Sequence, residues 1–197
     1  MMRTRLLLMA CLHVPLAVQA LDVLTPELAD SFERKVVAVQ GHTAPSPPAA
    51  RPTQFTEAET NSFLKFKSAP LLPIGLAEPE ITLHGEGRVT GRAVVDLDVV
   101  RQTQSRGSWL DPTRYLTGKL PVRAVGRVVT ADGMGRFELE RADISGVPVP
   151  KSLLAQMVNY FTRTADNPSG SSLDDTFELP ADIRRIEVAT GWFTVVQ

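Results

Sequence analysis

The segment from Leu120 to Thr164 constrains the fold of this chain most, because it predicts two strands and a helix in immediate succession. Its first eleven residues, Leu120 to Thr130, are mostly apolar, and Asp132-Gly133 follows, a dipeptide that favours a tight hairpin turn. Residues 135–144 then alternate with the period of two that is typical of a strand. After the proline-broken segment 145–150, apolar residues recur at helical spacing, at Leu153, Leu154, Met157, Val158 and Phe161. A hairpin and one helix bury little surface alone, so we expect this helix to lie against a larger sheet.

The first 20 residues have the pattern of an export signal. Two arginines precede an apolar run at residues 6–18, and Val18-Gln19-Ala20 has the small residues that a signal peptidase accepts. This run, broken by Pro15, is only about a dozen residues long and cannot span a hydrocarbon core of ~30 Å. A lipid anchor at Cys11 is not expected, because only about five apolar residues precede it. We therefore predict a periplasmic or secreted protein that has no transmembrane span once the signal peptide is removed.

Charge and cysteine content argue against two classes of function. The full chain has a net charge of −1, and removal of residues 1–20, which hold two arginines and no acid, changes it to −3. A weakly acidic chain is poorly suited to non-specific nucleic-acid binding, which depends on neutralising phosphates. Cys11 is the single cysteine and leaves with the signal, so neither a disulfide nor thiol chemistry is expected in the mature chain.

Residues 21–40 predict an N-terminal helix. Thr25 is suited to cap it, Pro26 fits its first position, and Gly41 is suited to end it. The helix has one apolar face, formed by Leu28, Phe32, Val36 and Val39. This face is expected either to pack on the rest of the chain or to dock on a partner or a membrane surface. Residues 41–54, which contain four prolines, predict an extended linker.

Residues 55–197 predict a single α+β domain. Thr56-Glu57-Ala58-Glu59 has the capping-box pattern and begins a second helix, and the apolar, proline-broken segment 69–79 predicts a packed loop. Further strands are predicted at residues 80–84, 88–100, 176–179, 183–189 and 192–197. The long strand has one apolar face and one mostly charged face, which indicates an antiparallel sheet that is wet on one side.

No pattern in the chain predicts catalysis or metal binding. Gly85-Glu86-Gly87 precedes a strand, whereas a dinucleotide-binding loop needs a helix at that point. Asp96 and Asp98 would share one strand face, as paired carboxylates in metal sites do, but no nearby histidine or further acid supports such a site. Only His42 and His84 remain after signal removal. We therefore expect a non-enzymatic protein without a cofactor.

Arginines share faces of the predicted strands, in the pairs Arg88/Arg92 and Arg123/Arg127. Two interpretations are open. The arginines form a patch for anionic head groups, or they belong to a solvated sheet face on which they pair with cross-strand glutamates such as Glu138. The solvated face is the favoured interpretation.

Three places in the chain resemble bacterial members of the TULIP (tubular lipid-binding) superfamily, which are secreted or periplasmic proteins. They are the hairpin Val122 to Ile144, the segment Ile144 to Pro150 that leads into the helix ending near Phe161, and Phe177-Glu178-Leu179-Pro180 with the closing hairpin. The resemblance covers roughly residues 56–197. It implies a curved sheet wrapped round a helix, an apolar groove and no catalytic residues. Because this chain is short, an open cleft is expected in place of a full tube.

The expected fold class is therefore α+β, with a curved antiparallel β-sheet meander packed against two amphipathic helices and an N-terminal helix on a Pro-rich linker. The expected function is that of an exported, non-enzymatic binder or carrier of a lipid or other apolar ligand in the cell envelope. The residues expected to line the ligand site are Phe63, Phe66, Val95, Leu97, Leu153, Met157 and Phe161. The alternative is an envelope protein-interaction or assembly module that docks through the apolar face of the N-terminal helix.

Overall fold

The computed structural model describes residues 23–41, 50–103, 117–161, 168–170, 172–173 and 175–197. Its elements follow in the order α1 (Pro26–Gln40), β1 (Pro52–Thr56), α2 (Glu57–Phe66), the 3-10 turn η1 (Ala69–Leu71), β2 (Leu76–Gly85), β3 (Arg88–Asp96), α3 (Leu97–Thr103), β4 (Lys119–Ala131), β5 (Met134–Ile144), β6 (Val147–Pro148), α4 (Lys151–Phe161), β7 (Thr176–Glu178), β8 (Arg185–Ala189) and β9 (Trp192–Val196). The expected α+β class with a large antiparallel sheet is confirmed. The predicted signal peptide lies outside the described residues.

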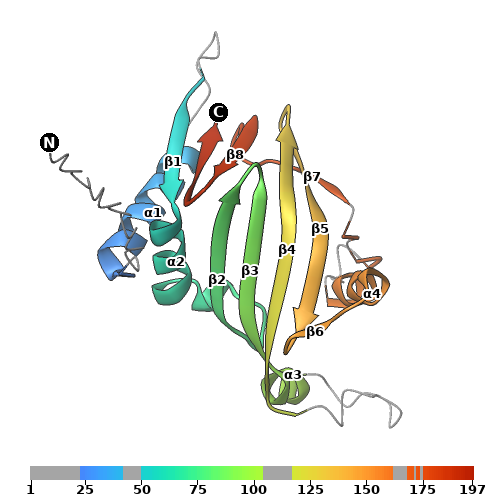
Figure 1. Ribbon diagram of the computed structural model, residues 1–197. Coiled ribbons are helices and arrows are strands. Elements are labelled where there is room, and N and C mark those ends of the chain that lie inside the picture. The colour runs from blue at the N-terminus through green and yellow to red at the C-terminus, as the bar shows by residue number, and fades with distance from the viewer. Residues whose placement is uncertain (1–22, 42–49, 104–116, 162–167, 171, 174) are drawn as a thin grey trace, which may run out of the picture.

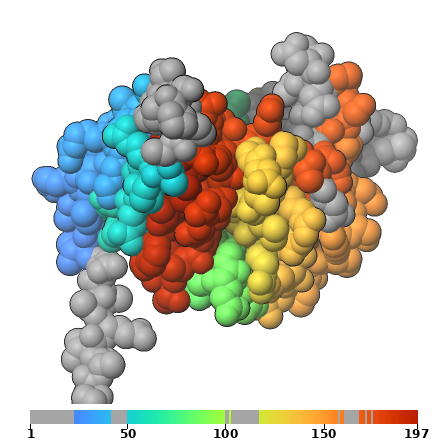
Figure 2. Space-filling view, turned by 90° about the horizontal axis from the view of Figure 1, so that it is seen from above, coloured from blue at the N-terminus to red at the C-terminus, as the bar shows by residue number. Residues whose placement is uncertain are grey.

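Two antiparallel sheets make up the fold (Figure 1). The larger has six strands in the order β2-β3-β4-β5-β6, with β7 also paired to β5, and the smaller has three strands in the order β1-β9-β8. Seen from above, the C-terminal hairpin, in red, lies between the blue and cyan N-terminal elements and the yellow strand β4 (Figure 2). Thr130 of β4 ties the sheets together, because its hydroxyl donates to the carbonyl of Ile186 over 2.9 Å and accepts from the Ile186 amide over 2.8 Å.

The hairpin at the centre of the large sheet has the predicted turn and one irregularity. Asp132 and Gly133 have φ of 49° and 80°, as a two-residue hairpin turn requires. The β4–β5 register shifts between Val125 and Gly126, which marks a β-bulge. A Cβ at Gly126 would lie 2.4 Å from Phe137 Cζ and 2.7 Å from the carbonyl oxygen of Glu138. Glycine at this position therefore lets β5 lie close to β4.

The strand predicted at residues 88–100 ends early, and this prediction was wrong for residues 97–100. β3 ends at Asp96 and the helix α3 begins at Leu97. Asp96 caps this helix, since its Oδ1 accepts from the amides of Asp98 and Val99 over 3.1 Å each. The Asp98 carboxylate accepts from the amide of Gly118 over 3.0 Å. The two carboxylates therefore do not form the paired set on a strand face that the sequence suggested.

The main core lies where α1 covers the small sheet. Val39, Phe55, Leu179, Ile183 and Val195 form its buried cluster, with Phe32 and Val36 packed against them. The ring of Phe55 stacks on Phe193 at 4.9 Å and meets the edge of Phe32 at 5.2 Å. Three of the four residues on the predicted apolar face of α1 thus pack inside the domain. Of the two interpretations of this helix, the structure agrees with packing on the rest of the chain.

The predicted linker is shorter than the sequence suggested. Of residues 41–54, those from 42 to 49 lie outside the described residues, whereas Pro52 to Thr56 form the edge strand β1. Proline is accepted as the first residue of an edge strand, because no partner strand needs its missing N–H there. β1 pairs with β9 over its whole length. Residues 52–54 of the predicted linker therefore belong to the small sheet.

Candidate functional site

A cavity of about 540 Å³ lies between α2, the turn η1 that follows it and the first half of β2. We call it the α2–β2 pocket. Its apolar lining comes chiefly from Leu24, Leu64, Ala69, Leu72, Leu76 and Ala77. Its polar lining comes from Asn61, Lys65, Ser68, Glu78 and Glu80. Its size falls in the range of small-molecule sites, about 300–1,000 Å³, and an apolar wall with a few polar groups is their usual composition.

Side chains of α2 hold the helix against the free edge of β2 and so fix one wall of this pocket. The Asn61 amide donates to the carbonyl of Ile81 and accepts from the Ile81 N–H, both over 2.8 Å. One turn earlier, Glu57 accepts from the Leu83 N–H over 2.7 Å. An edge strand presents unpaired backbone groups, and these two side chains pair with them as a neighbouring strand would. The buried side of α2 is therefore polar.

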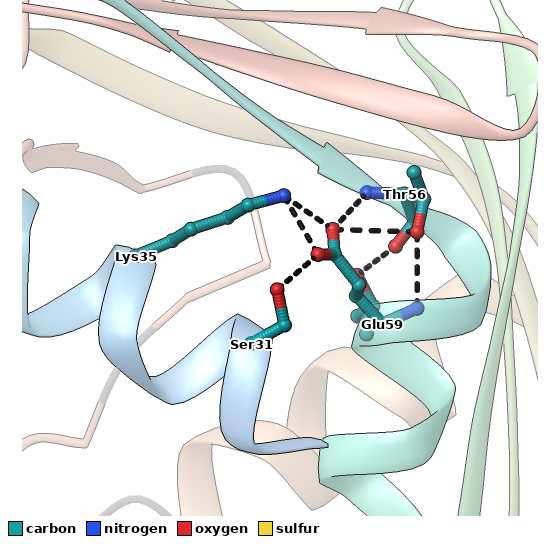
Figure 3. Close-up of polar contacts among 5 residues, drawn as sticks. Ser31, Lys35, Thr56 and Glu59 are labelled. Carbon is teal, nitrogen blue, oxygen red and sulfur yellow. Dashed lines mark hydrogen bonds and ion pairs between the residues drawn. The ribbon is translucent and has the colours of Figure 1, made fainter. Parts of the chain in front are cut away.

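A buried carboxylate then fixes α1 onto α2 (Figure 3). Glu59, which is 6% exposed, accepts from Lys35 Nζ on both oxygens over 2.7 Å, from Ser31 Oγ over 2.7 Å and from the Thr56 amide over 2.9 Å. Burial is the strongest single influence and raises the pKa of Glu59. The hydrogen bonds from Lys35, Thr56 and Ser31 together outweigh it and hold this pKa below its usual value of 4.5. The capping box predicted at Thr56 and Glu59 is confirmed. Glu59 caps α2 and also accepts hydrogen bonds from Ser31 and Lys35 of α1.

The structure does not bring the predicted lining residues together in one site. Phe63 packs on the ring of Phe32 at 4.8 Å, and Phe66 is 43% exposed at the end of α2. Val95 is half-buried on β3, and Leu97, also half-buried, begins α3. Leu153 is 47% exposed on α4, which lies beside β5, at the far side of the large sheet from α2 (Figure 1). The side chains of Met157 and Phe161 lie outside the described residues.

Sequence reasoning missed the residues that line the α2–β2 pocket, and Leu64, Leu72 and Leu76 are the clearest cases. For Leu72 and Leu76, the signal that could have found them is the apolar segment 69–79, which three prolines interrupt. Such a segment cannot bury all its apolar side chains against itself. The sequence predicts a packed loop here, whereas the structure has the turn η1 at Ala69–Leu71 and begins β2 at Leu76. Between them, Leu72 lines the pocket, and Leu71 is 72% exposed.

His84, Arg88 and Glu138, which the sequence singled out, have side-chain partners in the structure. His84 Nε2 lies 2.8 Å from the hydroxyl of the buried Thr90. Arg88 pairs with Glu140 over 2.7 Å, in agreement with the solvated-face interpretation of the arginines, while Glu138 pairs with its neighbour Arg136. Within the described ranges, no group of three or more His, Cys, Asp or Glu side chains is placed to hold a metal ion.

Comparison with models of protein families, with curated proteins and with solved structures found no match for this chain. Among the helices that the structure describes, none is both long and apolar enough to cross a membrane. The function must therefore be argued from the pocket and the side chains that surround it.

Proposed function

We propose that this protein binds a lipid or another apolar ligand in the α2–β2 pocket, without catalysing its conversion, and that it does so in the cell envelope. The observation that carries the proposal is the pocket itself, about 540 Å³ with a largely apolar wall. The export signal predicted at residues 1–20 supports the location.

Affinity in such a pocket comes from removing apolar surface from water. Each buried methylene contributes about 0.8 kcal/mol before the cost of immobilising the ligand is subtracted. The α2 wall of the pocket is held by hydrogen bonds to β2 and by the Lys35–Glu59 ion pair, so this wall needs little ordering when the ligand binds. Leu64, Leu72 and Leu76 supply the contact surface, and Asn61 and Lys65 supply polar groups at its margin.

Two adjacent leucines allow a matched test. Leu72 lines the pocket, whereas Leu71 is 72% exposed and does not. The probe is N-phenyl-1-naphthylamine, an uncharged apolar fluorophore, titrated into the mature chain and displaced by decanol. We expect saturable binding that Leu72→Trp weakens, because the indole occupies part of the pocket, and that Leu71→Trp retains.

A second blocking variant, Ala69→Phe, protects the test against a misfolded Leu72→Trp protein, and circular dichroism checks each fold. Ala69 lines the same pocket from the turn η1. Absence of saturable binding to the wild-type protein would refute the proposed function. Equal binding by the Leu71 and Leu72 variants would show that the ligand sits elsewhere.

A further inference from the structure

A row of four charged side chains crosses the large sheet beside the α2–β2 pocket. Glu80 of β2 is the cross-strand partner of Arg92, Arg92 of Arg123, and Arg123 of Asp143. The row therefore reads acid, arginine, arginine, acid. Like charges directly opposite each other on neighbouring strands repel, so an anion within reach of both central guanidinium groups would lower this repulsion.

The acids at the ends of the row provide only some of the hydrogen-bond acceptors that these two guanidinium groups can use. Glu80 Oε1 lies 3.7 Å from Arg92 Nη1, a long ion pair between two side chains that are each about half exposed. Arg123 Nε is buried and has no hydrogen-bond partner among the described residues. A buried donor without an acceptor destabilises the fold, so rotation of the Arg123 side chain toward an acceptor brought by a ligand would remove this cost.

Both arginines line a second cavity, of about 320 Å³. We call it the arginine pocket, and its charged lining consists of Arg92, Arg123, Glu78, Glu80 and Asp143. Glu78 and Glu80 also line the α2–β2 pocket, so the two cavities share a wall.

That shared wall is irregular. The β2–β3 register shifts between Ala77 and Glu80, which leaves Glu78 and Pro79 outside the ladder. Glu78 has a φ of 51°, a conformation that residues other than glycine rarely adopt. Backbone in such a conformation is retained at ligand sites more often than elsewhere.

We propose that the ligand is an amphiphile with a monoanionic head group, a carboxylate or a phosphodiester, which binds between Arg92 and Arg123 while its apolar part occupies the α2–β2 pocket. This inference rests on the proposed function. Guanidinium groups bind such oxygens with paired, charge-assisted hydrogen bonds. The three carboxylates in the arginine pocket oppose a free dianion, so inorganic phosphate without an apolar tail is not expected to bind.

The test compares ligands that differ only in the head group, by calorimetry on the mature chain. Decanoate and decanol share a chain length, and a short-chain phosphatidylglycerol supplies the phosphodiester, so the two anionic sources are distinguished. Arg123→Gln removes one of the two central positive charges of the row. Arg127→Gln is the matched control, because Arg127 lies on the same strand and face, also opposite another arginine, Arg88, and does not line the arginine pocket.

We expect Arg123→Gln to weaken binding of the anionic amphiphile about tenfold or more, as loss of charge-assisted hydrogen bonds does, with decanol affinity unchanged. Arg127→Gln should change neither affinity. If decanol binds but decanoate and phosphatidylglycerol bind no more tightly, or if the two variants lose the anions equally, the inference is overturned while the proposed function stands. Inorganic phosphate binding as tightly as the amphiphiles also overturns it. Failure of all apolar ligands to bind refutes the proposed function itself.

Discussion

Replacement of Asn61 by leucine tests the view that α2 is held on β2 by side-chain pairing with a strand edge. Asn61 is 8% exposed and makes two hydrogen bonds of 2.8 Å to the backbone of Ile81. Leucine has a similar size but leaves the N–H and the carbonyl of Ile81 without a partner. Each such buried group costs about 1–3 kcal/mol, and the added apolar burial offsets part of this. We expect a net loss of about 3 kcal/mol, which lowers Tm by roughly 6–12 °C in a chain of this size.

The assay is urea unfolding of the protein without ligand, with backbone hydrogen exchange as a local readout. The Ile81 amide should exchange faster in Asn61→Leu, whereas the Leu83 amide, which donates to Glu57, should stay protected. Gln54→Leu removes an exposed amide from β1 and should stay within about 0.5 kcal/mol of wild type. A loss below 0.5 kcal/mol for Asn61→Leu, with unchanged exchange at Ile81, would refute the reasoning.

Three further predictions concern other parts of the fold. The pKa of Glu59 is lower in the folded chain than its usual 4.5, so ionised Glu59 stabilises the fold fully above that pH, and this stabilisation is lost as pH falls through the folded pKa. In urea unfolding, Glu59→Gln should therefore be less stable than wild type at pH 7. The difference should narrow toward pH 3. Gly126→Ala should lower the free energy of unfolding by about 1–3 kcal/mol, because the new Cβ would lie 2.7 Å from the carbonyl oxygen of Glu138 and overpack the two strands. The readout is the shift in Tm, and an unchanged Tm would mean that β5 can move away from β4. Asp96→Ala should cost about 1 kcal/mol through loss of the α3 cap, whereas Asp96→Asn should retain most of the stability in the same assay.

Features governed by neighbouring residues could be predicted from the sequence. The Asp132-Gly133 turn and the cap at Thr25 depend on a few adjacent side chains, and both are present in the structure. The boundary at Asp96 was missed because the alternation of apolar residues continues through Leu97 and Val99, although these residues belong to a helix. Asp96, the cap with which the helix begins, was a weaker signal than the alternation that continues past it.

The site was harder to predict, because its determinants lie far apart in the chain. The polar residues of α2, such as Asn61, look solvent-facing by periodicity, yet their partner is the backbone of a strand some 20 residues later. Hydrophobic patterns do not record such pairing. The same limit explains why Phe63 and Leu153 looked suited to one apolar wall, although α2 and α4 lie at different edges of the sheet (Figure 1).

The position of β9 has a consequence for when this chain can fold. β9 is the middle strand of the small sheet, between β1 and β8, and the last residue, Gln197, bonds back to the carbonyl of Val39 over 2.8 Å. Phe55 contacts Phe32 of α1, but Phe55 and Val39 gain their contacts with Phe193 and Val195 only when the C-terminal hairpin has been made. Contacts of such long range delay folding. We therefore expect this core to close late, when β8 and β9 join β1 and α1.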